Sequence, residues 1–592
     1  MLREHVLKFF LVTFLFFAFP WSVSADSLSQ QVVFSVNSDF DLHKRSEVSA
    51  SVRKITDQLY FYIEDAWWNS VSVQRRSEMS AVFSRLALHF EEEIYPTLTA
   101  IFGKEATPGI DNDMRITVLV HQMKDKARGY VNTADGYTKF QVPRSNEREM
   151  LYLNLNGIET SLAKSYFAHE FMHLIHFNEK ELKKNIVDDI WFQEGLAELA
   201  PTFVGYDNNA EQSYLDSRKR DFIKNPRDSI TEWKGLAADY GVVHIFFQYL
   251  LEQYGQEVLA DAFKSAEIGI VSLNEAFTKH GIAKDFAQVF EEWTIAVFLN
   301  DCTYGSEYCF TNPKLADLKI APFTNFLSPF GNSELTVSNQ TKNWTGNWHK
   351  ISGGKDILKV LFDGNPTVTF RVPYLIEKRD GTYEIGSMTL SEEQNGEVVV
   401  QGFKDENKAL IIIPSIQTKV SDFLGSEQSY FFSWTASTEE AEEEEPQAVV
   451  VNPDPIVVAL LAQIAELQAE VLRLQAAIVA ALGGDNSQFV CGKFNVNLYF
   501  GLQDNADVSC LQQFLRDQGS EIYPEGLVTG NFLSLTRQAV TRFQEKYAED
   551  VLTPLGLTQG TGYVGSLTRN KINAVQGTDL LVRAHGLTPL ED

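Results

Sequence analysis

A His-Glu-x-x-His pattern inside one apolar run constrains this chain more than any other feature. The run Ser165–Phe177 contains no Pro or Gly, so it predicts a single helix. His169 and His173 are four residues apart on that helix, and their imidazoles therefore project from one face. Two neutral imidazoles so placed can share one Zn²⁺, with Glu170 beside the metal rather than on it. The alternative is a core helix whose histidines are satisfied by other polar groups.

A second motif, Trp191-Phe-Gln-Glu194-Gly-Leu-Ala-Glu198, offers carboxylates to the same site. Glu194 is the expected third ligand, which gives a His₂Glu set with the fourth position left to water. Glu198, one turn later, is placed to accept the free N–H of a ligating histidine. His176 competes as a ligand, but two helical turns place it about 10 Å from His169, too far for one ion.

The two motifs together resemble those of the gluzincin metallopeptidases, in particular the secreted bacterial hyicolysin type. The resemblance covers about residues 85–300 and implies a zincin-like domain with a helical lobe, acting on proteins or peptides. The zinc ligands that it implies are His169, His173 and Glu194, with Glu170 as the general base. In the helical stretch that follows, either Tyr240 or His244 could donate a hydrogen bond to a developing oxyanion.

Length and charge limit the number of domains and the classes of partner that this chain can have. A chain of 592 residues is too long for one core, and a formal net charge of −28 argues against nucleic acid and anionic membranes as partners. Residues 1–25 are predicted to be a signal peptide, with Arg3 and Lys8 before the apolar run Phe9–Phe19 and a small-residue site ending at Ala25. The mature protein is therefore expected to be exported, with no membrane span.

The predicted fold class is multidomain α+β, beginning with a zinc metallopeptidase domain at residues 26–325. Within it, Ser46–Ser70 and Val73–Phe102 are expected to be helical. The alternation of apolar and polar residues predicts strands over Arg115–Val120 and Glu149–Leu155.

Residues 326–437 change to short β-rich runs, which predict a β-sandwich. The expected strands are Asp356–Phe362, Thr367–Val372, Gly396–Gln401, Ala409–Ile413 and Ser429–Trp434. No residue of this region carries visible chemistry, so a spacer is favoured over a substrate-binding module.

Three further segments follow. Residues 438–455 form an acidic linker, and residues 456–484 carry Val or Ile at a and Leu at d over about four heptads, which predicts a short coiled coil and a parallel homodimer. Residues 489–578 resemble the three-helix peptidoglycan-binding domain. That segment also contains an internal echo, Thr529–Arg537 against Thr561–Arg569.

The cysteines are expected to pair, because an exported protein meets an oxidising compartment. The predicted disulfides are Cys302–Cys309 and Cys491–Cys510.

These features together predict an extracellular zinc endopeptidase held at the cell wall through peptidoglycan. One alternative is a peptidase of peptidoglycan cross-bridges. Another is a non-catalytic wall or adhesion protein, which the intact Glu170 and the complete ligand set disfavour.

Overall fold

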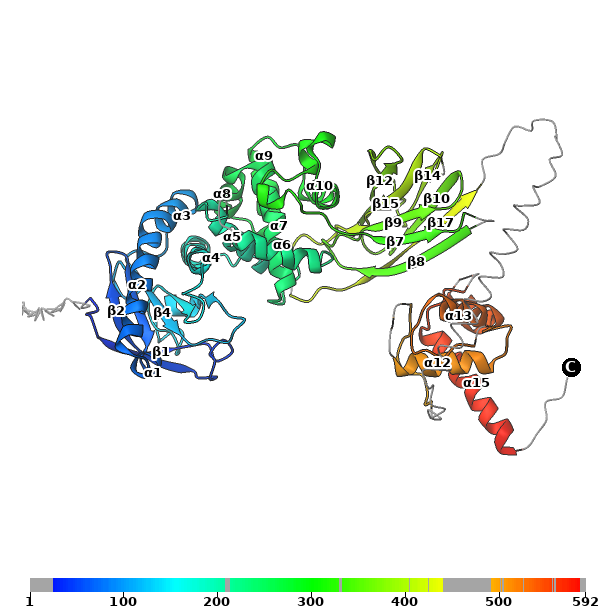
Figure 1. Ribbon diagram of the computed structural model, residues 1–592, viewed down its shortest axis with the longest axis horizontal. Coiled ribbons are helices and arrows are strands. Elements are labelled where there is room, and N and C mark those ends of the chain that lie inside the picture. The colour runs from blue at the N-terminus through cyan, green and yellow to red at the C-terminus, as the bar shows by residue number, and fades with distance from the viewer. Residues whose placement is uncertain are drawn as a thin grey trace, which may run out of the picture. The chain divides into compact units, whose positions relative to one another are not determined.

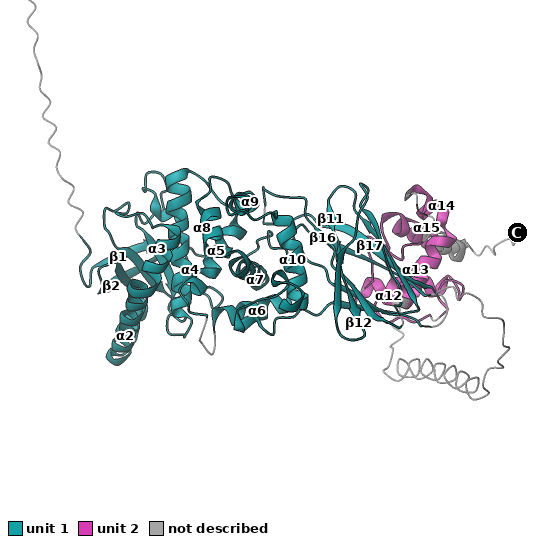
Figure 2. Cartoon of the chain, turned by 90° about the horizontal axis from the view of Figure 1, so that it is seen from above, with its two compact units in different colours: residues 1–444 teal, residues 445–592 magenta. Residues whose placement is uncertain are grey.

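The computed structural model describes two compact units, within residues 1–444 and 445–592 (Figures 1 and 2). The described ranges are 25–207, 213–329, 333–403, 405–423, 425–439 and 491–585, the last without positions 501, 503, 504, 525, 556, 558 and 559. Helices and several sheets occur together, which is compatible with the predicted multidomain α+β class. The predicted domain boundaries remain predictions.

A six-stranded mixed sheet begins the first unit, in the order β1-β2-β3-β4-β6-β5. Its strands are β1 (Gln31–Ser35), β2 (Glu47–Ile55), β3 (Leu59–Glu64), β4 (Ile116–His121), β5 (Gly129–Tyr130) and β6 (Met150–Asn154). Strands β3, β4 and β6 run parallel, whereas β5 pairs antiparallel with β6 at the edge. The strands expected over Arg115–Val120 and Glu149–Leu155 are confirmed as β4 and β6.

The helix expected over Ser46–Ser70 is wrong, because β2 and β3 occupy most of that segment. Every residue of β3 is buried. Phe61 and Ile63 face the main helical core while Tyr60 and Tyr62 face a second core on the other side of the sheet. A strand covered on both faces shows a continuous apolar run without alternation, and such a run resembles a buried helix in sequence.

Helices cover one face of this sheet and then form an all-helical region, as expected. The first group is α1 (Asp65–Ser70), α2 (Val73–His89), α3 (Tyr95–Phe102) and α4 (Ala163–His176). The second group is α5 (Ile190–Phe203), α6 (Tyr214–Lys224), α7 (Ala237–Tyr254), α8 (Gln256–Lys264), α9 (Gly269–Lys279) and α10 (Phe286–Leu299). One apolar core joins both groups to the sheet, and it includes buried residues of α4 and α5.

The β-rich region contains a four-stranded sheet (β14-β10-β17-β8), a five-stranded sheet (β13-β12-β15-β9-β7) and a two-stranded pair (β11-β16). Its strands are β7 (Phe323–Leu327), β8 (Ser333–Thr341), β9 (His349–Gly353), β10 (Ile357–Gly364), β11 (Phe370–Arg371), β12 (Pro373–Lys378), β13 (Tyr383–Ser387), β14 (Asn395–Val400), β15 (Asn407–Ile412), β16 (Ser415–Ile416) and β17 (Tyr430–Glu439). Four of the five expected strands are present as β10, β14, β15 and β17, whereas only Phe370–Arg371 of the strand expected over Thr367–Val372 forms a strand, β11. Side chains from the two larger sheets enclose one apolar core, as two facing sheets do.

The second unit contains α12 (Ala506–Asp517), α13 (Ser534–Lys546), α14 (Ala548–Val551) and α15 (Ser566–His585). Its internal echo has a structural counterpart in two buried glutamines. The Gln512 amide donates to the Asn531 carbonyl at 2.9 Å, and the Gln544 amide donates to the Tyr563 carbonyl at 2.8 Å. Gln512 thus ties α12 to the turn before α13, and Gln544 ties α13 to the turn before α15, so the two sequence repeats share one hydrogen-bonding arrangement.

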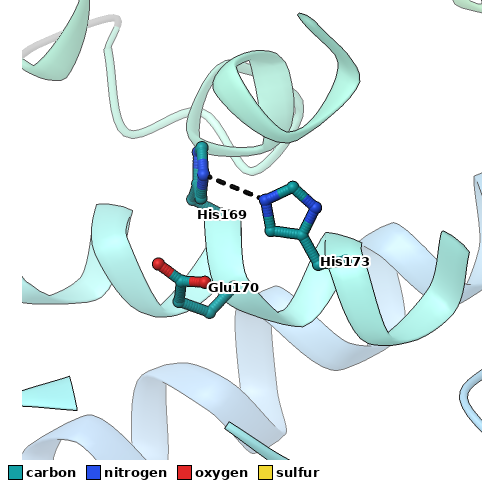
Figure 3. A group of neighbouring side chains, drawn as sticks. All are labelled: His169, Glu170 and His173. Carbon is teal, nitrogen blue, oxygen red and sulfur yellow. Dashed lines mark hydrogen bonds between the residues drawn. The ribbon is translucent and has the colours of Figure 1, made fainter. Parts of the chain in front are cut away.

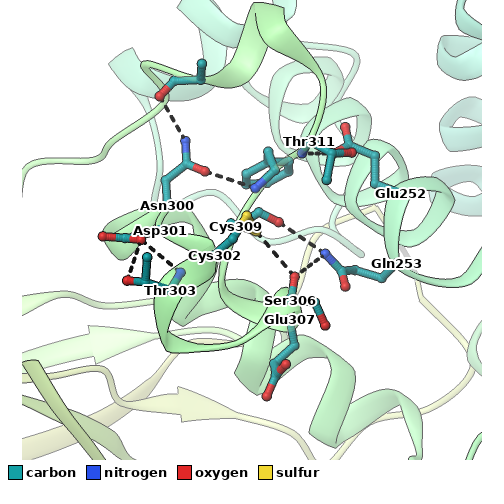
Figure 4. The surroundings of a disulfide bond; sticks show 12 residues. Glu252, Gln253, Asn300, Asp301, Cys302, Thr303, Ser306, Glu307, Cys309 and Thr311 are labelled. Carbon is teal, nitrogen blue, oxygen red and sulfur yellow. Dashed lines mark hydrogen bonds between the residues drawn. A yellow bond between two sulfur atoms is a disulfide. The ribbon is translucent and has the colours of Figure 1, made fainter.

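Both predicted disulfides are present. Cys302 and Cys309 close a short loop after α10, and Cys491 and Cys510 join the segment that precedes α12 to that helix. Figure 4 shows the first bridge, where the Gln253 side chain of α7 donates to the carbonyls of Ser306 (2.8 Å) and Cys309 (3.1 Å). The bridge therefore fastens this loop to the helical region.

Three predictions fall outside the described residues: the signal peptide except for its last residue, nearly all of the acidic linker, and the coiled coil of residues 456–484. Within the part of the chain that the structure describes, no helix combines the length and apolarity needed to cross a membrane.

Candidate metal centre

Helix α4 carries the His-Glu-x-x-His residues in the middle of the first unit. Its apolar side chains, among them Phe167 and Phe171, are fully buried in the main core. His169 and His173 project from the same face, and their Nε2 atoms lie 3.2 Å apart (Figure 3). The Glu170 carboxylate lies beside the two rings rather than between them (Figure 3).

Helix α5 packs against α4 and brings Glu194 to the two imidazoles. The Glu194 Oε2 atom lies 3.5 Å from His169 Nε2 and 3.7 Å from His173 Nε2. Ligands bound at about 2.0–2.2 Å around one tetrahedral ion are separated by similar distances. Glu194 Oε2 is also buried without a hydrogen-bond partner among the described residues, so a cation would satisfy it. These three side chains fit a metal ion.

Glu170 is the other carboxylate within reach, since His169, Glu170 and His173 offer ligand atoms within 4.8 Å of one another. Glu194 is nevertheless the better ligand, because its Oε2 is close to both Nε2 atoms, whereas Glu170 lies to one side of them. The sequence analysis made the same choice from the incomplete ligand set and the family resemblance, and the ligand set remains a proposal.

Glu198 is a fully buried carboxylate behind His169. Its Oε1 lies 3.4 Å from His169 Nδ1, on the side of the ring away from Glu194. The Arg218 guanidinium donates to both of its oxygens, at 2.7 and 2.9 Å, and the Tyr214 hydroxyl also donates to it. Burial is the largest single effect on the pKa of Glu198 and raises it, but the Arg218 charge together with His244 and His169 outweighs burial and lowers the pKa.

Without a bound metal, the pKa values of the site residues are shifted in different directions. Burial opposes a charged His169, but Glu194 and the neighbouring carboxylates raise its pKa to about 9. Burial lowers the pKa of His173 to about 4 and raises the pKa of Glu170 to about 8. A bound dication would favour neutral imidazoles and ionised carboxylates, so metal binding is expected to release protons.

The two candidate oxyanion donors lie in different environments on α7. His244 is fully buried, and its Nδ1 lies 3.0 Å from Glu198 Oε2. Tyr240 is only partly buried, and its pKa is raised by burial and then by the nearby Glu194 carboxylate. Its hydroxyl has no hydrogen-bond partner among the residues that the structure describes. The structure thus places His244 behind Glu198, and the Arg218 guanidinium lies over the Tyr240 ring, 4.6 Å from its centroid.

Sequence reasoning missed the residues that neutralise Glu198. Tyr214 and Arg218 lie one turn apart on α6, and both reach the same carboxylate. Their i, i+4 spacing is visible in the sequence, but nothing local relates it to Glu198. Only the packing of α6 on α7, and of α7 on α5, brings these groups together.

The edge strand β5 was also not identified from sequence, and it runs beside α4. Gly129 lies so close to Glu170 that a Cβ at this position would be 2.7 Å from Glu170 Oε1. A glycine here lets the strand approach the carboxylate. β5 is the last strand of the six-stranded sheet, with β6 as its only neighbour there.

Comparison with known proteins gives one partial similarity. No family model matches the sequence. The chain is 25% identical over 219 residues to the neutral metalloprotease ShpI of Staphylococcus hyicus, a match that covers 32% of this chain and 47% of that protein. The chain therefore spans about half the length of the relative it matches. The similarity supports a relationship to metalloproteases and implies a metal ion.

The ion pair behind the metal centre yields a prediction about stability. Arg218→Leu should lower the free energy of unfolding of the first unit by about 3–5 kcal/mol, because it leaves the Glu198 charge buried without its main partner. Urea denaturation followed by tryptophan fluorescence measures this change. Arg220→Leu, at an exposed position of the same helix, is the matched control and should change little. A loss below about 1 kcal/mol for Arg218→Leu would show that Glu198 does not depend on this pair.

Proposed function

We propose that this chain is an exported zinc endopeptidase that hydrolyses peptide bonds of proteins. The observation that carries the proposal is the convergence of three ligand atoms, from His169, His173 and Glu194, with the Glu170 carboxylate beside them. The partial similarity to a neutral metalloprotease supports the same activity.

His169, His173 and Glu194 would hold the ion, and Glu198 would orient His169. When bound, a zinc ion supplies Lewis acidity to the scissile carbonyl and lowers the pKa of water. Glu170 accepts the proton of the attacking water and passes it to the leaving amine. Burial raises the pKa of Glu170 to about 8 in the metal-free protein, and a bound dication would favour the ionised carboxylate that can accept this proton.

Tyr240 is the better of the two candidate oxyanion donors. Its hydroxyl is available, and its pKa is raised, so it stays protonated and can donate a hydrogen bond to the developing negative charge. His244 is already bonded to Glu198, and we assign it to holding that carboxylate.

Strand β5 would bind the substrate backbone. An edge strand presents backbone N–H and C=O groups to an extended peptide, which can add to the sheet as a further strand. Gly129 of β5 lies against Glu170, so a peptide added there would run past the general base.

The metal assignment predicts that Glu194→Ala will lose most of its zinc. The full chain should contain one zinc per molecule by elemental analysis, because two imidazoles without the carboxylate form an incomplete site. Glu257→Ala, an exposed carboxylate on α8, should keep its zinc. Full zinc content in Glu194→Ala would show that another residue completes the site.

The general-base assignment predicts that Glu170→Gln will keep its zinc and fold but lose hydrolysis. The amide has the same shape and cannot accept the proton of water, so turnover of casein should fall by about 10²–10⁴-fold. Zinc content and circular dichroism matching the unaltered protein would show that the loss is chemical. Turnover within a few fold of the unaltered protein would refute this role of Glu170.

We further propose that the second unit anchors the enzyme to peptidoglycan. The support is the sequence resemblance of residues 489–578 and the internal duplication built on Gln512 and Gln544. The predicted dimer through residues 456–484 would present two such units, and joined sites bind more tightly than single ones.

The anchoring proposal predicts that the full-length Glu170→Gln protein will sediment with purified cell-wall sacculi. The inactive variant prevents digestion of the preparation during the assay. A chain ending at Glu439 should stay in the supernatant. Equal sedimentation of both chains, or of neither, would contradict anchoring by the second unit.

A further inference from the structure

The β-rich region is built into the core of the helical region. Trp344 and Trp348 lie between β8 and β9, and both are buried in the main core together with α10. The Trp344 ring lies 4.8 Å from the Phe286 ring, and the Trp348 indole donates to the Thr294 carbonyl at 2.9 Å. Two tryptophans buried in this way hold the sheets and α10 in one fixed arrangement.

The β16–β17 loop, described at residues 417–423 and 425–429, reaches from this region to the helix that carries Glu194. The Phe423 ring meets the Trp191 ring edge to face, with centroids 6.4 Å apart. Trp191 is buried in the first turn of α5, three residues before Glu194. A shift of Trp191 would therefore move the expected third ligand.

The same loop also contacts Glu232 and Trp233, which precede α7 and its Tyr240. The Glu427 backbone N–H donates to the buried Glu232 carboxylate at 2.9 Å. Gly425, at φ +72°, lies so close that a Cβ would be 2.9 Å from the Trp233 carbonyl oxygen. The Trp233 ring in turn packs edge to face on the Tyr240 ring at 4.8 Å.

The loop itself is tied down at its base. The Asn343 side-chain oxygen accepts from the backbone N–H groups of Thr418 and Lys419, and the Trp344 indole donates to the Lys419 carbonyl at 2.6 Å. Lys419 also pairs with Glu427 at 2.9 Å across the loop. These bonds connect the loop to the tryptophan that anchors the β-rich region.

We propose that the β-rich region is a positioning element of the metal centre. Phe423 holds α5 and its Glu194 in place through Trp191. Gly425 and Glu427 hold the segment before α7 that packs on Tyr240. The proposal rests on the proposed function and extends it, because it gives the β-rich region a role in the reaction rather than that of a spacer. Phe423 and its neighbours are positioning residues, since they act through Trp191 and Trp233.

The strength of each contact sets the size of the expected effect. An edge-to-face aromatic pair changes an equilibrium by up to about tenfold. Displacement of a reacting group by a fraction of an ångström lowers the reaction rate, because the group is no longer correctly oriented. Loss of the Phe423 ring should therefore loosen Glu194 without unfolding the chain, because this ring is only half-buried.

The test uses the full zinc-loaded chain and two readouts, peptide hydrolysis and the rate of zinc transfer to a chromogenic chelator. Phe423→Ala should lower kcat about tenfold with KM within about twofold, and should release zinc about tenfold faster. Phe423→Tyr keeps the ring and should restore both rates. Val420→Ala, at an exposed position of the same loop, is the control and should change neither.

Gly425→Ala tests the contact of the loop with Trp233 separately from its contact with Trp191. The added methyl group would press on the Trp233 carbonyl, so kcat should fall while zinc release stays as in the unaltered protein. A fall in kcat without faster zinc release would support the role of the Gly425–Trp233 contact in positioning Tyr240. Unchanged kcat in Gly425→Ala would remove Gly425 from the proposal.

The outcomes distinguish this inference from the proposed function. If the unaltered protein hydrolyses peptides and Glu170→Gln does not, the function stands, and unchanged kcat and zinc release in Phe423→Ala overturn the positioning role. A lower unfolding midpoint in Phe423→Ala with unchanged kcat and zinc release shows a purely structural role and also overturns it. If the unaltered protein hydrolyses nothing, the proposed function fails, and zinc release alone still decides whether Phe423 positions Glu194.

Discussion

The buried negative charge of Glu198 is the constraint on which the metal centre depends. A carboxylate removed from water must be compensated, and groups from three other helices do so: His169 of α4, Tyr214 and Arg218 of α6, and His244 of α7. The helices that form the site are thereby joined at one point. Glu194, one turn earlier on α5, has no hydrogen-bond donor to its Oε2 among the described residues, which leaves that oxygen for a cation.

Local spacing explains which parts of the site could be predicted from sequence. His169, Glu170 and His173 lie on one helix, whose geometry fixes their relation without knowledge of the fold. Glu194 followed from the chemistry of an incomplete ligand set and from a family resemblance. Arg218 could not be found in this way, because an arginine on a solvent-facing pattern acquires its role only when α6 packs on α7 and α7 packs on α5.

Flanking residues, rather than alternation alone, decided which strands could be predicted. β4 and β6 are buried on both faces like β3, but each is a short apolar run between polar residues, whereas the strands of the β-rich region are separated by turn signals. Leu59–Glu64 is buried on both faces, so its sequence shows only apolarity, and a helix was the wrong choice. The role of the β-rich region was equally hidden, because Phe423 and Trp191 are far apart in the chain and meet only through tertiary packing.

Anomalous X-ray diffraction at the zinc absorption edge, from crystals of the full chain, tests the ligand assignment most directly. A single zinc peak is expected between α4 and α5, at about 2.0–2.2 Å from His169 Nε2, His173 Nε2 and a Glu194 oxygen. Glu170 should then lie close to this peak but outside bonding distance. A peak bound by Glu170 in place of Glu194, or zinc found only elsewhere in a fully loaded protein, would contradict the proposed metal centre.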